Sequence, residues 1–406
     1  MSRTLHPPGT EPRSIVPLPE HPPSVRTTLH AVLFASACVL FGVMWDISWH
    51  SSIGRDTFWS PPHLAIYLGG IVAGLGSGLL VLRLSFRGTA EERAATVRFW
   101  GPFRGPLGAW ICIWGALAMV VSAPFDDWWH NAYGLDVEII SPPHAVLALG
   151  IGAINLGALV MVLPWLSRAR DAGDLDEVRR LGRLHALAAG LLLLMAATFN
   201  TELSFRLWMH SSQFWLAAAR TYPWILVAAA VSSGLRWPTT SVAAVYTVAR
   251  LLVIWTLPLF PAEPKLAPIL TPVDHMVAPD FPLLLVVPAL AMDMVLQRWR
   301  APDPEPWWSD WALAAVLGGT FMVVFAAAQW PFSFFLHSEW SRNWFFATEN
   351  APYSVGQDTY WTRREFYPWD QGPAALRAKL AQAMLIAMAS ARVGLWLGGW
   401  MRRVRR

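Results

Sequence analysis

The chain has 406 residues, of which 55% are hydrophobic and only 14% are charged. Because an ordinary soluble domain carries about 25% charged residues, this composition excludes a soluble multidomain protein and a disordered chain. The 25 Trp residues agree with that, since indole rings favour the headgroup level of a bilayer. Only two Cys are present, both within apolar runs, so a disulfide scaffold is excluded as well. The composition predicts an integral membrane protein that is embedded in a lipid bilayer.

Apolar runs that are long enough to cross a bilayer as helices recur along the chain. They cover residues 28–45, 62–84, 106–123, 143–166, 184–199, 213–234, 240–259, 280–297, 310–329 and 376–399. The predicted fold class is therefore an all-α, polytopic membrane bundle of about ten transmembrane helices. Residues 1–27 are rich in Pro and lack an apolar core, so we expect a disordered cytoplasmic tail rather than a signal peptide.

The Arg residues gather in segments that an even number of spans would place on one side, at 87–104, 168–183 and 402–406. The positive-inside rule makes that side cytoplasmic. We therefore expect a protein of the plasma (inner) membrane with both termini in the cytoplasm. The basic balance of the chain is thus an orientation signal, and no nucleic-acid partner is predicted. Most His residues lie at the opposite, outer ends of the spans: His50, His63, His130, His144, His210, His275 and His337.

Four parts follow from this pattern. After the tail come a four-span module at 28–167, a cytoplasmic connector at 168–183 and a six-span module at 184–406. The last module includes an outer loop at 330–375 that is rich in aromatic residues and too long for a simple connector. We expect this loop to form a lid or a docking surface.

An internal repeat carries the polar residues of the four-span module. The first copy reads Asp46-Ile-Ser-Trp-His50, then Gly54-Arg-Asp56, then Ser60-Pro-Pro-His63, and the second reads Asp126-Asp-Trp-Trp-His130, then Gly134-Leu-Asp136, then Ser141-Pro-Pro-His144. In each copy one span ends in Asp and the first His, and the next span opens at Ser-Pro-Pro-His. The repeated unit is a helix hairpin.

The spacing within each hairpin brings the three polar side chains to one depth. Residues i and i+4 lie on one helix face, so Asp46 stands beside His50 and Asp126 beside His130. A Ser suits the N-cap of the returning helix and Pro suits its first position, which places His63 or His144 in the first turn. The sequence thus predicts two metal sites near the outer face of the membrane, Asp46/His50/His63 and Asp126/His130/His144. Two His and a carboxylate suit non-haem iron, copper or zinc, and residue chemistry alone leaves that choice open.

At these residues the chain resembles the C subunit of the copper-dependent membrane monooxygenases, the particulate methane and ammonia monooxygenase family. That subunit carries D-x-S-W-H-x4-R-D-T-x3-P-x-H. This sequence matches every named position with Asp46, Ser48, Trp49, His50, Arg55, Asp56, Thr57, Pro61 and His63. A second family motif has Asn followed by His, an acidic residue, Pro and His. In that motif the four residues follow the Asn by 4, 10, 16 and 18 positions, and at the same spacings this sequence has Asp126, His130, Asp136, Pro142 and His144. The departure is Asp126, which puts a carboxylate where the family has an amide.

The resemblance implies that both triads bind copper, with iron or zinc less favoured. It also implies O2-dependent oxidation of a small apolar substrate or ammonia, in a complex with A- and B-type subunits. It covers about residues 27–167 and leaves the six-span module without a counterpart. The alternative is therefore a membrane protein that takes up, stores or senses copper without oxygenase activity.

Other charged residues have weaker assignments. Asp56 and Asp136 are candidates to accept the free N–H of a ligating His, or are simply loop charges, and Arg55 is a candidate partner of Asp56 or of another subunit. Within the spans, Asp293, Arg250 and Arg392 are functional candidates or pair locally. Asp274 and His275, with Glu202 and His210, are candidates for a third ligand set, although no spacing repeats there.

Overall fold

The computed structural model describes residues 23–134, 141–299, 308–349, 351–356, 370 and 372–405. In these ranges nine helices are long and apolar enough to cross a membrane, which confirms the all-α polytopic class. They are α1 (Pro23–Ser52), α2 (Pro61–Arg87), α4 (Leu107–Tyr133), α5 (Pro142–Asp171), α6 (Leu175–Phe199), α7 (Ser212–Ser233), α8 (Pro238–Thr256), α10 (Ser309–Leu336) and α11 (Pro373–Met401). The shorter elements are α3 (Ala90–Ala94), β1 (Val97–Arg98), β2 (Arg104–Gly105), α9 (Val286–Arg298) and the 3₁₀ turns η1 (Thr201–Leu203), η2 (Arg206–Trp208), η3 (Leu257–Leu259) and η4 (Glu339–Ser341).

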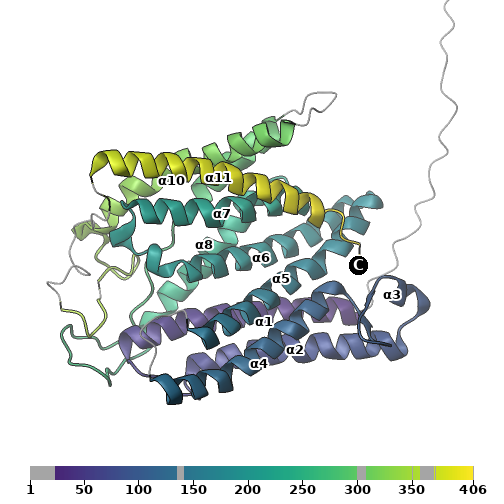
Figure 1. The fold of residues 1–406 in the computed structure, drawn as a ribbon, viewed down its shortest axis with the longest axis horizontal. Helices are drawn as coiled ribbons and strands as arrows, with labels where there is room; N and C mark the ends of the chain where they lie inside the picture. Colours follow the sequence, from purple (N-terminus) through teal and green to yellow (C-terminus); the bar gives the residue numbers. More distant parts are fainter. Residues whose placement is uncertain are drawn as a thin grey trace, which may run out of the picture.

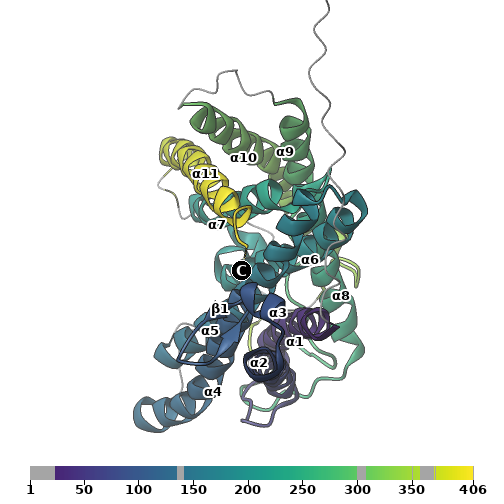
Figure 2. The ribbon, with the colours of Figure 1, turned by 90° about the vertical axis from the view of Figure 1, so that its right-hand side faces the viewer.

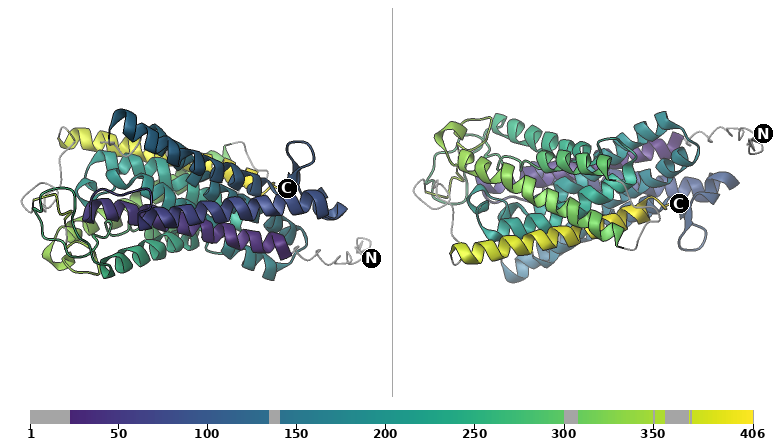
Figure 3. Two further views of the ribbon diagram at one scale, coloured as in Figure 1. Left: turned by 90° about the horizontal axis from the view of Figure 1, so that it is seen from below. Right: turned by 90° about the horizontal axis from the view of Figure 1, so that it is seen from above.

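The long helices lie roughly parallel to one another along a common axis (Figure 1). Seen along that axis, α1, α2, α4 and α5 occupy one side and α9, α10 and α11 the other, with α6 and α8 between them (Figure 2). The packing follows the same order, because α5 contacts α4 and α6, α6 contacts α7 and α8, and α11 contacts α7 and α10. Helix α1 begins and α11 ends at one end of the bundle (Figure 3), which we call the terminal end. The opposite end, where α1 ends and α2 begins, is the site end.

The expected span at 280–297 is the one that differs most from prediction, because only Val286–Arg298 is helical. Residues 277–284 precede it without helical structure. The cause is local: Pro279 and Pro282 lack a backbone N–H and disfavour helical geometry in the residues before them. This pass through the bundle is therefore composite, half extended chain and half helix.

The composite pass still runs the length of α8. Near the site end the Arg250 guanidinium donates to the Asp280 carbonyl over 2.8 Å, and halfway along the Leu283 N–H donates to the Tyr246 hydroxyl over 3.2 Å. At the terminal end the Asp293 carboxylate accepts from the backbone N–H of Thr239 (3.1 Å). Two of the charges expected within the spans, Arg250 and Asp293, thus have local partners, and Asp293 serves as a cap for the start of α8.

Side chains of other helices satisfy the backbone of the extended stretch. Gln329 on α10 accepts from the Leu284 N–H (2.9 Å), Ser48 on α1 donates to the Val277 carbonyl (2.5 Å), and Ser52 accepts from the Val277 N–H (2.7 Å). Extended backbone at membrane depth is stable only when its polar groups are bonded within the protein. Ser48 and Ser52 flank His50, so the extended stretch also holds the end of α1 that carries the first predicted site.

We expect Gln329→Leu to lower the free energy of unfolding by about 1–3 kcal/mol, because the Leu284 N–H would be left buried without an acceptor. The matched control is Gln297→Leu, at an exposed position near the end of α9, with a change within about 0.5 kcal/mol. Unfolding with sodium dodecyl sulfate in mixed micelles measures both variants. Equal losses for the two would show that this hydrogen bond contributes nothing specific.

Several boundaries also differ from prediction. Residues 23–27, expected in the disordered tail, form the first turns of α1, and residues 1–22 lie outside the described ranges. The expected connector at 168–183 is mostly helical, because α5 continues to Asp171 and α6 begins at Leu175. Asp174 caps α6 by accepting from the Glu177 N–H over 2.9 Å, which leaves only a tight turn between the helices. Charged side chains thus extend these helices beyond their apolar runs.

Helices α4 and α5 approach each other closely through Gly residues. A Cβ atom on Gly150 would lie 2.8 Å from the Gly115 carbonyl oxygen and 2.8 Å from Cγ of Met119. A Cβ atom on Gly115 would lie 2.7 Å from the Gly150 carbonyl oxygen. Small residues that let two backbones meet are a common basis of helix association in membranes. This contact sets the spacing of the two helices that carry the second predicted site.

Candidate metal centre

Each repeat forms the hairpin that its sequence predicts. Helix α1 ends at Ser52, two residues after His50, and α2 begins at Pro61 after an N-cap at Ser60. In the second copy α4 ends at Tyr133 and α5 begins at Pro142 after an N-cap at Ser141. The hydroxyl of Ser141 accepts from the His144 N–H (3.4 Å), whereas that of Ser60 accepts from the Thr57 N–H (2.7 Å) and holds the loop instead.

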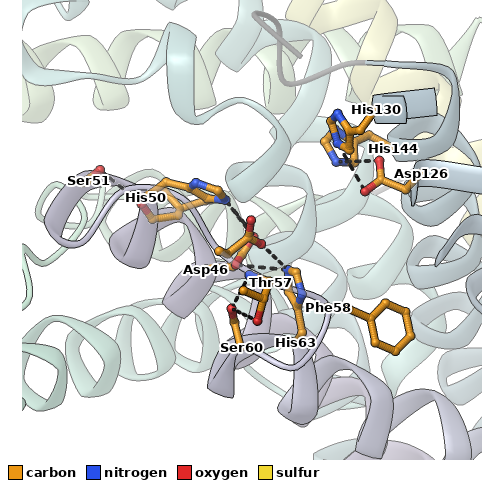
Figure 4. A network of polar contacts seen from close by, with 12 residues as sticks. Asp46, His50, Ser51, Thr57, Phe58, Ser60, His63, Asp126, His130 and His144 are labelled. Carbon is orange, nitrogen blue, oxygen red and sulfur yellow. Dashed lines mark hydrogen bonds and ion pairs between the residues drawn. The ribbon is translucent and has the colours of Figure 1, made fainter. Parts of the chain in front are cut away.

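The first hairpin gathers four side chains around one point (Figure 4). Nε2 of His50 lies 3.7 Å from Asp46 and 3.8 Å from Asp56, and Nε2 of His63 lies 3.4 Å from Asp46 and 2.7 Å from Asp56. Possible ligand atoms of Asp46, His50 and Asp56 all lie within 4.8 Å of one another. This group contains Asp56 in place of the predicted ligand His63, whose Nε2 instead contacts the two carboxylates from the returning helix.

The chemistry of this cluster fits a divalent or monovalent metal ion. Oδ1 of Asp46 is buried, and Nε2 of His63, 3.4 Å away, lies at the limit of hydrogen-bond distance, so a cation bound here would improve the compensation of this carboxylate oxygen. Partial burial opposes ionisation of Asp56, but the hydrogen bond from His63 and the nearby His50 outweigh it and lower the pKa of this carboxyl group. Two carboxylates and two imidazoles are therefore available at one place.

The second hairpin repeats the arrangement of one Asp beside two His. Oδ2 of Asp126 lies 3.4 Å from Nε2 of His130, and Oδ1 lies 3.5 Å from Nε2 of His144. Oδ1 of Asp126 is buried, as is Oδ1 of Asp46 in the first site. Asp136 falls in the range 135–140, which lies outside the described residues. In each hairpin both predicted His thus lie near the predicted Asp, and among the described residues the group of three whose possible ligand atoms all lie within 4.8 Å of one another is Asp46, His50 and Asp56.

The structure explains why both copies of the repeat have a glycine in the loop after the first His. Gly54 and Gly134 both have a positive φ, +104° and +88°, in the loop after the first His. A Cβ atom at Gly54 would also lie 2.6 Å from Cβ of Leu266 and 2.6 Å from the Tyr353 hydroxyl, whereas nothing lies within 4 Å at Gly134. The first loop is therefore packed against distant segments of the chain at Gly54, whereas among the described residues only the backbone conformation favours glycine at position 134.

Gly54→Ala is expected to lower the free energy of unfolding by about 2–4 kcal/mol, since it adds both backbone strain and a steric clash. Gly134→Ala carries the backbone strain alone, so its expected cost is about 1–2 kcal/mol. Thermal unfolding of the two variants in the same detergent makes the comparison. A larger loss for Gly134→Ala would contradict the packing of the first loop.

Tyr67 is a residue at this site that the repeat did not reveal. Its ring centroid lies 6.0 Å from that of His63, and its hydroxyl donates to the Phe58 carbonyl over 3.1 Å. The phenol is also within electrostatic range of Asp46, Asp56 and Asp126, so it lies near both triads. The signal was available, because Tyr67 stands four residues after His63 on the same helix face. Arg55 is exposed, and Asp56 contacts the histidines rather than Arg55.

Comparison with protein-family models, curated proteins and solved structures finds no match to this chain. The assignment of the two sites therefore rests on the geometry of the hairpins and on the residue pattern.

The third set of candidate ligands is dispersed in the structure. His210 stacks on Trp330 with ring centroids 4.1 Å apart, and its Nε2 lies 2.9 Å from the Trp330 carbonyl. Burial lowers the pKa of His210, which keeps its imidazole neutral. Asp274 and His275 instead pair with each other over 2.6 Å in the loop after α8. These residues serve packing and loop structure rather than one metal site.

Proposed function

We propose that the two hairpins are metal centres that bind copper and that the chain is a subunit of a membrane monooxygenase-like complex. The observation that carries the proposal is the convergence of Nε2 of His50 and Nε2 of His63 on the carboxylates of Asp46 and Asp56. Imidazole suits copper, which has the highest divalent affinity of the first-row metals. The match of residues 46–63 to the C-subunit motif supports copper over iron or zinc.

Each residue has a distinct part in this proposal. The neutral imidazoles of His50, His63, His130 and His144 would hold the metal, and Asp46 and Asp126 would offset its charge. Copper, when bound, would supply a one-electron couple for O2-dependent oxidation of a small apolar substrate or ammonia. Asp56 would join the ligands of the first site and add a second carboxylate to it.

Access to the sites agrees with a small reactant. The His50 side chain is 52% exposed, while those of Asp46 and His63 are each 23% exposed, so one side of the cluster is open and the other is covered. The cluster lies at the site end, where the positive-inside rule places the outer face of the membrane. O2 and a small substrate would therefore arrive from the lipid boundary or the outer solution, with A- and B-type subunits as the expected partners.

The experiment that tests this function is oxygen uptake by copper-loaded membranes supplied with methane, short alkanes or ammonia. Substrate-dependent uptake is expected for the native chain with its partner subunits, and it should be absent in a His50→Ala/His130→Ala variant. Copper binding without any substrate-dependent O2 consumption would remove the oxygenase part of the proposal and leave the metal centres.

A second function, copper uptake across the membrane, is favoured by one specific observation. The pass formed by residues 277–298 is half extended, and interrupted helices at membrane depth are common where transporters bind their substrates. Proteoliposomes that contain the chain alone separate the two functions. Copper accumulation that requires His50 and His130 would favour transport, and binding without accumulation would favour the subunit.

A further inference from the structure

A pocket of about 520 Å³ opens at the site end of α8, apart from both hairpin sites. Six of its lining residues define its chemistry: Trp255, Phe260, Asp274, His275, Trp344 and Glu349. Its volume is in the range of sites that bind small organic ligands. The walls come from three segments, namely the end of α8 with η3, the loop around Asp274, and the turn that follows η4.

Hydrogen bonds between these segments fix the walls. Nε1 of Trp255 donates to the Phe345 carbonyl over 3.1 Å, which ties α8 to the turn after η4. The Met276 N–H donates to the Phe260 carbonyl and the Ala262 N–H to the Asp274 carbonyl, each over 3.0 Å. These two bonds pair the loop with the chain after η3. The pocket is therefore largely preformed, which limits the entropy lost on binding.

The lining combines aromatic rings with negative charge. The Trp255 and Trp344 centroids are 6.2 Å apart with the planes at 63°, an edge-to-face pair, so a cation over the face of one ring also lies near the other ring. The hydrogen bond from His275 lowers the pKa of Asp274, so this carboxylate is ionised at neutral pH. None of the described residues that line the pocket is Lys or Arg.

We propose that this pocket binds an organic ammonium cation, a primary or quaternary amine with a small apolar body. The face of a Trp ring attracts the cation, the carboxylate of Glu349 offsets its charge together with that of the exposed Asp274, which also bonds His275, and Phe260 contacts the apolar part. The pocket lies where a membrane-spanning helix ends, at the level of lipid headgroups. The ammonium group can therefore belong to a free amine or to a zwitterionic lipid headgroup.

The test for a free amine is equilibrium dialysis of the full-length chain, in a neutral maltoside detergent, against radiolabelled choline and ethanolamine. Saturable binding of one of them is expected. Trp344→Ala and Glu349→Gln should each weaken it at least about fivefold. The matched controls are Trp340→Ala, whose side chain is exposed and lies outside the pocket, and Glu263→Gln in the same loop region, with changes under about twofold.

Competition with 3,3-dimethyl-1-butanol, the neutral isostere of choline, tests whether the pocket recognises the positive charge. The isostere should compete at least about tenfold more weakly than choline, because it keeps the shape and loses the cation. Glu349→Gln preserves side-chain volume, so it reports on the pocket even if Trp344→Ala fails to fold.

A second measurement tests whether the ammonium group belongs to a lipid headgroup. In nanodiscs of mixed phosphatidylglycerol and phosphatidylethanolamine, native mass spectrometry counts the lipids that stay with the chain. Preferential retention of phosphatidylethanolamine that Trp344→Ala and Glu349→Gln abolish would identify a headgroup as the ligand. The proposal is overturned if neither amine nor headgroup binds, if the isostere competes as well as choline, or if the pocket variants behave as the controls do. None of these measurements requires copper, so their outcome is independent of the proposed monooxygenase activity.

Discussion

Replacing His50 and His63 together by Ala is expected to empty the first centre and leave the second intact. The copper content should fall from about two to about one per chain. Both Nε2 atoms face the same two carboxylates, so the double substitution removes every imidazole of that cluster. Loss of two ligands should weaken the site by well over the hundredfold that outer hydrogen-bond partners can contribute.

The second centre has the equivalent variant. His130→Ala/His144→Ala should likewise leave about one copper per chain, and the fourfold variant should leave none. His30→Ala is the matched control, because His30 is exposed on α1 and its Nδ1 lies 2.8 Å from the Arg26 carbonyl, far along the helix from Asp46. Thermal unfolding without metal shows whether each variant is folded. Copper that persists in the folded fourfold variant would place the metal elsewhere.

Gly150→Ala should disrupt the second centre without touching a ligand. The added methyl group meets the Gly115 carbonyl oxygen and Met119 at 2.8 Å, and backbone cannot move away as a flexible side chain can. Separation of α4 from α5 would move Asp126 and His130 away from His144. We expect a loss of about 1–3 kcal/mol in unfolding free energy and roughly tenfold weaker metal binding at this site alone.

Gly152→Ala is the control, because Gly152 lies two residues further along α5 and faces Met195 on α6 instead of α4. Its added Cβ atom would meet only Cε and Sδ of Met195, at 3.7 and 3.8 Å, which is ordinary contact. Because Ala favours helix over Gly by up to about 1 kcal/mol, this variant should be as stable as the native chain or slightly more so. Copper titration of the two variants, with the first centre as an internal reference, makes the comparison. Equal metal affinities would show that the Gly contact does not position the second centre.

The sequence predicts the helices well because their apolar runs are long and periodicity is a local property. The pass at 280–297 was mispredicted for a reason that is also local, since Pro279 and Pro282 interrupt an otherwise apolar run. What no local rule could supply is the set of partners that stabilise the extended stretch. Gln329, Tyr246 and Ser48 come from three different helices, and each is an ordinary polar residue in its own segment.

The candidate site shows the same division. The i, i+4 spacing and the Ser-Pro-Pro-His start were enough to bring Asp46 near His50 and His63. The sequence already made Asp56 a candidate acceptor for a ligating His, and Nε2 of His63 lies 2.7 Å from it. The path of its loop was not predictable, because that path depends on the positive φ of Gly54 and on the nearby Leu266 and Tyr353, far along the chain. The pocket beside α8 likewise joins segments about 90 residues apart, which only the folded chain brings together.

The most direct test of the central claim is the metal content of the native chain. The protein should be purified from copper-replete cells, and its copper, iron and zinc measured by inductively coupled plasma mass spectrometry against an amino-acid-based protein concentration. The two hairpin centres predict about two copper ions per chain, lost on treatment with a strong chelator and regained on titration with copper. A folded chain with no copper, or with the same copper content after all four ligand histidines are replaced, would contradict the account.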